Sequence, residues 1–147
     1  MKSQYEKKRL ITFDRIKIKS NYKYLLNTKV KFNEMFHSRS GEKIGIFYSS
    51  KDDINIPYNL YIAVSYIKQT LTLEFSSKIL KEKYPDLISR DTIKECLTNI
   101  NQLHICDIDV DSILSNGAIT SVDVTYDANL ILSDNLLNIL NSQVNNY

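Results

Sequence analysis

Alternating apolar and polar residues predict five β-strands along this chain. Residues 10–19 place cationic side chains on one side and isoleucines on the other, because successive residues of a strand point to opposite faces. Residues 58–66 are rich in aromatic and β-branched residues, and residues 70–76 alternate between apolar and polar. Only a short link separates these two segments, so they are expected to form a hairpin. Two more strands are predicted over residues 44–49 and 118–126.

Apolar residues at helical spacing predict two helices. The first is capped by Ser89 or Asp91 and has its apolar residues three and four positions apart. The second is predicted over residues 133–144. A shorter helical turn over residues 77–83 is expected to end before Pro85, because the residue before a proline is disfavoured in the α conformation.

Three segments carry weaker patterns. Residues 20–43 are polar and predict no regular element apart from a turn near Gly41. Residues 103–110 predict either a strand or an extended link. Residues 109–114 predict one helical turn that stops at Asn116 and Gly117.

The order strand, hairpin, helix, strand, helix is typical of an α+β fold. In such a fold an antiparallel sheet has helices packed on one of its faces. The whole chain, residues 1–147, is expected to form a single domain. Within it, residues 1–9 are expected to be a flexible basic arm and residues 10–147 the α+β domain.

Composition narrows the class of protein. The chain is 43% hydrophobic and 24% charged and has only 3 Gly and 2 Pro, which excludes collagen-like and mostly disordered proteins. The longest uncharged run has about 14 residues, fewer than the roughly 20 that a membrane span requires. The charged N-terminus has no apolar signal core, and the two cysteines, Cys96 and Cys106, lack Cys-x-x-Cys spacing. We therefore expect a cytoplasmic protein with buried, reduced thiols and no membrane association.

Charge is distributed unevenly along the chain. Residues 1–31 contain ten Lys or Arg and two acidic residues, whereas no basic residue follows Lys94 and six aspartates lie beyond residue 103. Such a split indicates a polyanion-binding surface beside an acidic region that can hold a cation. The alternative is that the lysines are simply solvated and the aspartates occupy turns and helix caps.

One face of the predicted sheet combines cationic and acidic side chains. If helices cover the apolar faces of the strands, the open face gathers Arg15, Lys17, Lys19, Thr72, Glu74, Asp123, Thr125 and Asp127. Metal-assisted phosphodiester chemistry uses both kinds of group, since lysine and arginine hold the phosphates while carboxylates bind Mg²⁺ or Mn²⁺. We therefore predict DNA-binding residues and metal ligands on this face. The DNA-binding residues are Arg15, Lys17 and Lys19, and the metal ligands are Glu74, Asp123 and Asp127.

The spacing of two predicted ligands limits the metal hypothesis. Asp123 and Asp127 are four residues apart, which separates their Cα atoms by about 13 Å in a regular strand. A single ion would therefore be held by one of them at most, unless the strand bends. The alternative is that both are solvated carboxylates on an exposed face or at the end of the strand.

Other catalytic patterns are missing or unspecific. His37 and His104 belong to no His-x-His or His-x-x-x-His pair, and three glycines cannot form a nucleotide-binding loop. Neither cysteine lies in a nucleophile elbow. Tyr61 and Tyr66 fall on a predicted core strand, and Tyr126 alternates with core-facing valines, so a packing role is expected for all three.

Three segments of the chain carry a family resemblance. They are residues 13–18 (FDRIKI), residues 71–80 (LTLEFSSKIL) and residues 119–127 (ITSVDVTYD). In this order they resemble the N-terminal half of the rolling-circle replication initiators of filamentous phages and related plasmids, the gene II and gene X replication-protein family. The segments are similar to that family's first strand, its glutamate-containing strand with a following Ser/Pro-x-Lys turn, and its hydrophobic-Asp-x-Thr strand. The resemblance covers roughly residues 10–132.

The resemblance implies both a fold and an activity. It implies an antiparallel-sheet nuclease fold and an initiator that nicks one DNA strand at an origin, using a tyrosine and a divalent metal. Glu74 and Asp123 match the family's strand glutamate and strand aspartate, which supports both as metal-site or phosphate-site residues. The arginine that commonly precedes that aspartate by two positions is Ser121 here. The nicking tyrosine and the remaining ligands are expected beyond residue 147.

These observations lead to one preferred hypothesis and two alternatives. We expect the DNA-binding N-terminal domain of a phage or plasmid replication initiator, whose partner is single-stranded or hairpin origin DNA. One alternative is a non-enzymatic phage or mobile-element protein that binds another protein through its acidic C-terminal face. The other is an intact, small, metal-dependent nuclease.

Overall fold

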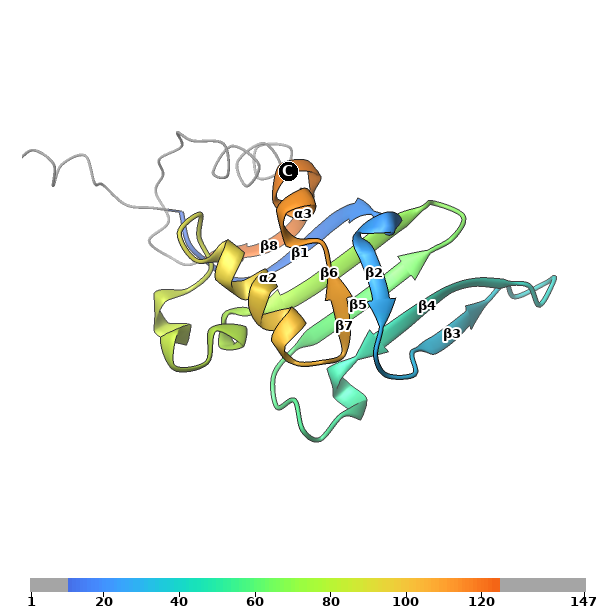
Figure 1. The fold of residues 1–147 in the computed structure, drawn as a ribbon, viewed down its shortest axis with the longest axis horizontal. Coiled ribbons are helices and arrows are strands. Elements are labelled where there is room, and N and C mark those ends of the chain that lie inside the picture. The colour runs from blue at the N-terminus through green and yellow to red at the C-terminus, as the bar shows by residue number, and fades with distance from the viewer. Residues whose placement is uncertain (1–10, 125–147) are drawn as a thin grey trace, which may run out of the picture.

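Two antiparallel sheets form the framework of the domain in the computed structural model, which describes residues 11–124 (Figure 1). The large sheet has six strands in the order β3-β4-β5-β6-β1-β8, and the small sheet pairs β2 with β7. The strands are β1 (Phe13–Asn21), β2 (Leu25–Thr28), β3 (Asn33–Phe36), β4 (Lys43–Ser49), β5 (Leu60–Ser65), β6 (Thr70–Ser76), β7 (Cys106–Ile108) and β8 (Ala118–Val124).

Short helices connect these strands. The α-helices of the described region are α2 (Ile93–Gln102) and α3 (Val110–Asn116), and the 3₁₀ segments are η1 (Tyr22–Tyr24), η2 (Ser50–Asp52) and η3 (Ser77–Asp86). Figure 1 shows α2, α3 and the small sheet on the same side of the large sheet. This arrangement confirms the predicted α+β class, with an antiparallel sheet that has helices on one face.

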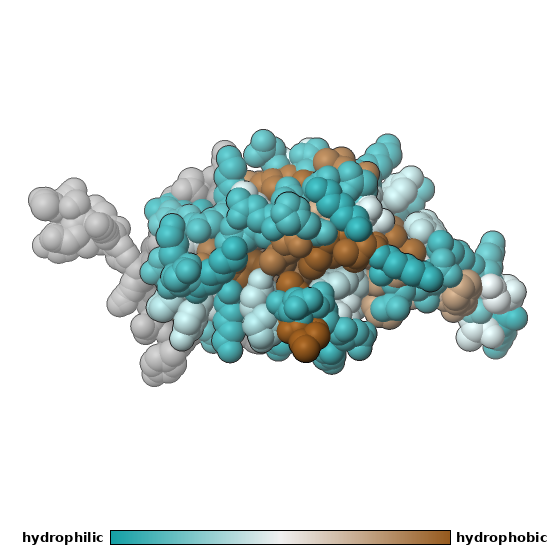
Figure 2. Space-filling model, turned by 60° about the horizontal axis from the view of Figure 1, so that its bottom comes forward, coloured by the Kyte–Doolittle hydropathy of each residue, from teal (hydrophilic) through white to brown (hydrophobic). Residues whose placement is uncertain are grey.

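The hydrophobic core lies between the large sheet and this helical layer. Ile16, Leu73 and Phe75 on the sheet are buried, as are Leu97 and Ile100 on α2. Full burial of one such side chain stabilises the fold by about 1.5–3 kcal/mol. Figure 2, which turns the lower edge of Figure 1 toward the viewer, shows apolar residues as a band along the middle of the molecule, between polar surfaces.

Strand prediction from alternation is confirmed in most of the described chain. The observed β1, β4, β5, β6 and β8 overlap the five predicted strands, and β5 and β6 form the predicted hairpin with Ile62 opposite Leu73. The predicted α2 is also present. The predicted helix over residues 133–144 and the basic arm over residues 1–9 lie outside the described residues.

The prediction that residues 20–43 are irregular is wrong. This segment contains η1, β2 and β3. Most side chains of β2 and β3 are exposed, so neither strand shows the alternation of apolar and polar residues by which a half-buried strand is recognised. Their hydrogen-bonding partners, β7 and β4, hold them in the extended conformation. The strand alternative for residues 103–110 is confirmed by β7, and α3 ends at Asn116 as predicted.

Two details of the helix prediction are wrong. The N-cap position of α2 is Thr92 and not Ser89 or Asp91, and the hydroxyl of Thr92 donates to the carbonyl of Leu87 at 2.7 Å and makes no capping hydrogen bond to the helix. The segment η3 breaks at Lys81, which has a φ of 59°, and continues through Pro85. Proline is tolerated there because the first turn of a new helical segment needs no N–H donor from it.

No helix of the described region is long and apolar enough to cross a membrane.

Candidate nucleic-acid interface

The open face of the large sheet brings together side chains from five strands. Residues that alternate with the core positions point away from the helical layer. One row across the sheet therefore runs through Ser121, Lys17, Glu74, Tyr61 and Ser49, as the strand registers show. Side chains directly opposite each other on neighbouring antiparallel strands have Cβ atoms about 4.5–5.5 Å apart. This row therefore places a lysine, a carboxylate and a phenol next to one another.

A second row lies two residues further along each strand. It runs through Lys19, Thr72, Ala63, Phe47 and Asn33. Together the two rows contain two lysines at one side of the sheet and two aromatic rings near its middle. We call the surface formed by Lys17, Lys19, Phe47, Tyr61 and Glu74 the open face.

The predicted gathering of cationic residues on one face is confirmed. Arg15 and Lys19 are exposed and Lys17 is partly buried, whereas the intervening Ile16 and Ile18 lie in the core. Lys17 and Lys19 form no ion pair with any carboxylate of residues 11–122. Their charges are therefore available to an external anion. The role of these residues in binding DNA stays a prediction.

The predicted metal ligands are divided by the strand order. Glu74 lies opposite Lys17 on β6, whereas Asp123 lies opposite Arg15 on β8, and β1 separates the two strands. Two strand spacings and an offset of two residues put their Cα atoms about 12 Å apart. The described part of the chain contains no cluster of three His, Cys, Asp or Glu residues suited to a metal ion. Asp127 and Thr125 lie outside the described residues, and the metal site stays a prediction.

A small depression marks the cationic end of the open face. It has a volume of about 40 Å³ and is lined by Arg15, Lys17, Glu74 and Ser121, with Ile16 and Val122. A water molecule in liquid takes up about 30 Å³, so the depression has room for one water or one small ion. It is too small for a base or a sugar, which must therefore lie above this surface.

The aromatic pair is the feature that the sequence interpretation missed. The rings of Phe47 and Tyr61 lie with their centroids 6.0 Å apart and their planes tilted by 32°. Burial raises the pKa of Tyr61, and the nearby carboxylate of Glu74 raises it further. The phenol therefore stays neutral at neutral pH and is able to donate a hydrogen bond.

The core position predicted for the tyrosines is wrong in two places, although the ring of Tyr61 packs against Phe47. Tyr61 lies on β5 as predicted, but on the face opposite the core, between the buried Leu60 and Ile62. The alternation within β5 is the signal that could have placed it there. Tyr66 lies in the link after β5 and is 41% exposed. Tyr126 is outside the described residues.

Two aspartates in the second half of the chain, Asp107 and Asp109, make contacts within the molecule. Asp107 accepts a hydrogen bond from Asn27 at 3.0 Å and pairs with Lys29 at 3.3 Å, and these contacts lower its pKa. Asp109 caps α3 by accepting from the backbone N–H of Ser112. These contacts favour the structural interpretation of these two aspartates.

The two histidines, His37 and His104, lie in different parts of the structure. The Nδ1 atom of His37 accepts from the backbone N–H groups of Arg39 and Ser40 at 3.1 and 3.2 Å, which closes a turn. His104 lies in the link between α2 and β7 with a φ of 62°. The structural interpretation of His37 follows from these contacts.

Comparison of the chain with known proteins identifies no relative. No protein-family model, curated protein or solved structure matches the chain. The class that the fold itself defines is an α+β domain in which, among residues 11–124, helices cover one face of the sheet and leave the other open. The segments that resemble rolling-circle initiators fall on β1, on β6 with the start of η3, and, for the described part of the third segment (residues 119–124), on β8, and these three strands are neighbours in the large sheet.

Proposed function

We propose that this chain binds single-stranded DNA across the open face of its large sheet. The observation that carries the proposal is the combination, on one sheet face, of Lys17 and Lys19 with the aromatic pair Phe47 and Tyr61. Proteins that bind single strands combine a cationic surface for the backbone with aromatic rings on which bases stack. Both parts are present here on rigid strands.

The dimensions of the open face suit one strand of DNA. Only β6 lies between β1, which carries the lysines, and β5, which carries Tyr61. The two outer strands are therefore about 10 Å apart, so one strand of DNA can contact the lysines and the rings together. Glu74 lies between them and repels phosphates. This repulsion favours a path in which the backbone follows the lysines while bases point toward the rings.

We place this binding activity in the N-terminal domain of a phage or plasmid replication initiator. The adjacency of the three resembling segments in the sheet supports this assignment, because segments far apart in the sequence form one contiguous surface. In that setting the domain holds origin DNA, and a tyrosine with Mg²⁺ or Mn²⁺ cuts it in the full-length protein. The engaged Asp107 and Asp109 give the protein-partner alternative less support.

Replacing Tyr61 by alanine tests the proposal. Loss of one stacking ring costs about 1–3 kcal/mol, so the Kd for a fluorescein-labelled 12-nucleotide oligo(dT) should rise roughly 5- to 150-fold in fluorescence anisotropy. Tyr61→Phe should keep most of the affinity because it keeps the ring. Tyr84→Ala is the matched control, since Tyr84 is 49% exposed on η3, away from the open face.

Two results would overturn the proposal. Equal affinity of the wild-type protein and Tyr61→Ala would show that the ring contacts no base. Absence of any oligo(dT) binding near 50 mM salt would show that the lysines of β1 are solvated surface. That result would favour the alternative in which the chain binds another protein.

A further inference from the structure

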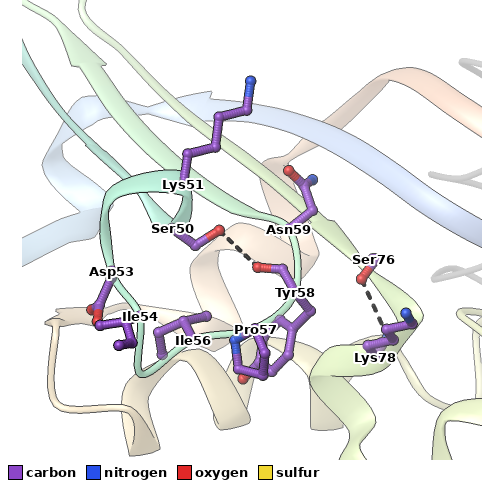
Figure 3. A pocket seen from close by; sticks show the side chains of 10 residues that line it. All are labelled: Ser50, Lys51, Asp53, Ile54, Ile56, Pro57, Tyr58, Asn59, Ser76 and Lys78. Atoms are coloured by element: carbon purple, nitrogen blue, oxygen red, sulfur yellow. Dashed lines mark hydrogen bonds between the residues drawn. The ribbon is translucent and has the colours of Figure 1, made fainter.

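A larger cavity lies at the end of the large sheet, where β6 meets η3. Its volume is about 660 Å³, within the range of about 300–1,000 Å³ typical of small-molecule sites. The residues important here are Lys51, Pro57, Tyr58, Asn59, Ser76 and Lys78 (Figure 3). They come from the loop between β4 and β5 and from the turn between β6 and η3.

The cavity is cationic. Lys51 and Lys78 are exposed, and neither forms an ion pair with a carboxylate of residues 11–122. The carboxylate that lines the cavity, Asp53, is already engaged on both oxygens. It accepts from the hydroxyl of Tyr48 at 2.8 Å and from the backbone N–H of Asn55 at 2.9 Å. The two lysines therefore favour an anionic ligand.

One hydrogen-bond donor of the cavity has no acceptor among the described residues. The side-chain Nδ2 of Asn59 is buried without a partner. A buried donor without an acceptor costs about 1–3 kcal/mol, and a turn of the Asn59 amide toward the cavity, where a ligand oxygen can accept from it, recovers that energy. Figure 3 shows the side chains of Asn59 and Lys51 projecting to the same side of the loop. An anion held by Lys51 therefore comes near the side chain of Asn59.

The other wall of the cavity is apolar. Ile54, Ile56 and Pro57 lie together on the opposite side of the loop, with Tyr58 beside them (Figure 3). Ile54 is 89% exposed, although isoleucine is strongly apolar. A flat ring laid against this wall would bury part of that apolar surface. A ligand with both an anionic group and a ring matches the two walls.

The cavity continues the open face. Asn59 precedes Tyr61 by two residues on the same side of the chain, and Ser76 follows Glu74 in the same way. Ser76 also lies opposite Arg15 in the sheet register. A DNA strand that crosses the open face over Lys17 and Tyr61 therefore reaches the cavity at the next positions along β5 and β6.

We propose that this cavity binds a terminal nucleotide that carries a phosphomonoester. Lys51 and the amide of Asn59, turned toward the ligand, hold the phosphate, Lys78 adds positive charge at the other end of the cavity, and the base packs against Pro57 and Ile54. The inference rests on the proposed function, because the cavity would hold one end of the DNA strand that is bound on the open face. Free mononucleotides and phosphorylated strand ends share this chemistry.

The test compares oligo(dT) that carries a 5′-phosphate, a 3′-phosphate or hydroxyl groups at both ends, by fluorescence anisotropy with an internal label. One phosphorylated form should bind at least fivefold more tightly than the hydroxyl form. The double variant Lys51→Gln with Lys78→Gln should remove that preference and leave binding of the hydroxyl form within twofold. Tyr61→Ala should weaken all three forms and keep their ratio, because it acts on the open face alone.

A mononucleotide titration separates failure of this inference from failure of the proposed function. Adding dTMP to ¹⁵N-labelled protein should shift the side-chain amide signal of Asn59 in the NMR spectrum, and Lys51→Gln with Lys78→Gln should abolish the shift. This result supports the cavity even if the open face binds no DNA. Equal binding of all three oligonucleotides together with an unshifted Asn59 signal would overturn the inference, as would a preference that persists in the double variant.

Discussion

Replacing Lys17 and Lys19 by glutamine should make DNA binding less sensitive to salt. Both side chains lie on the open face, and neither pairs with a carboxylate of residues 11–122, so a bound phosphate can contact them directly. Binding of a phosphate to a lysine releases a counterion from the DNA, and this release makes affinity fall with salt. Glutamine keeps the length and polarity of the side chain and removes only its charge.

The size of the effect follows from the number of lost contacts. For single strands the logarithm of affinity falls with the logarithm of salt by about 0.7 for each neutralised phosphate, so two lost contacts lower the slope by about 1.4. Between 50 and 200 mM salt the wild-type protein should therefore lose about sevenfold more affinity than the double variant. Tyr61→Ala, in contrast, should lower affinity at every salt concentration and keep the slope.

The assay is a salt titration of oligo(dT) binding by fluorescence anisotropy. Lys23→Gln with Lys94→Gln is the matched control, because both lysines are exposed and belong to η1 and α2, outside the open face. The control loses the same net charge, so its slope separates local contacts from the general field of the protein. An unchanged slope in the Lys17 and Lys19 variant, or an equal change in the control, would refute the reasoning.

Three further predictions concern the stability of the domain. Burial raises the pKa of the Cys96 and Cys106 thiols to about 12 from 9.0, so the unfolded thiols ionise first and the free energy of unfolding, measured with urea, should fall as pH rises from 9 toward 12. In a variant with both cysteines replaced by alanine, the free energy of unfolding should fall less over the same pH range, because the contribution of the thiols is absent. Asn101→Ala should cost about 1–3 kcal/mol, because the side chain donates to the carbonyl of Ile108 and accepts from its N–H, and an unchanged urea midpoint would contradict this. Phe75→Ala should cost about 3–5 kcal/mol because the ring is fully buried, and a loss below 1 kcal/mol in thermal unfolding would show that the core collapses around the gap.

The local pattern of the sequence was sufficient for most elements next to the core. In β1 and β6, buried residues alternate with exposed or partly buried ones, and α2 buries Ile93, Leu97 and Ile100 along one side. Each of these elements has one solvent-facing side and one buried side, so the spacing of its apolar residues shows the period of a strand or a helix. The cationic side of the sheet was predictable for the same reason, because Lys17 and Lys19 share the period of β1.

Only the tertiary structure decided which of these faces meet and what they form together. The pairing of β2 with β7, the neighbouring positions of Phe47 and Tyr61, and the cavity beside Asn59 all join residues from different strands or loops. Strand order and register depend on contacts between residues far apart in the sequence, which no local period encodes. The sequence by itself therefore determined the class of fold and the cationic strand, whereas the aromatic pair and the cavity required the folded chain.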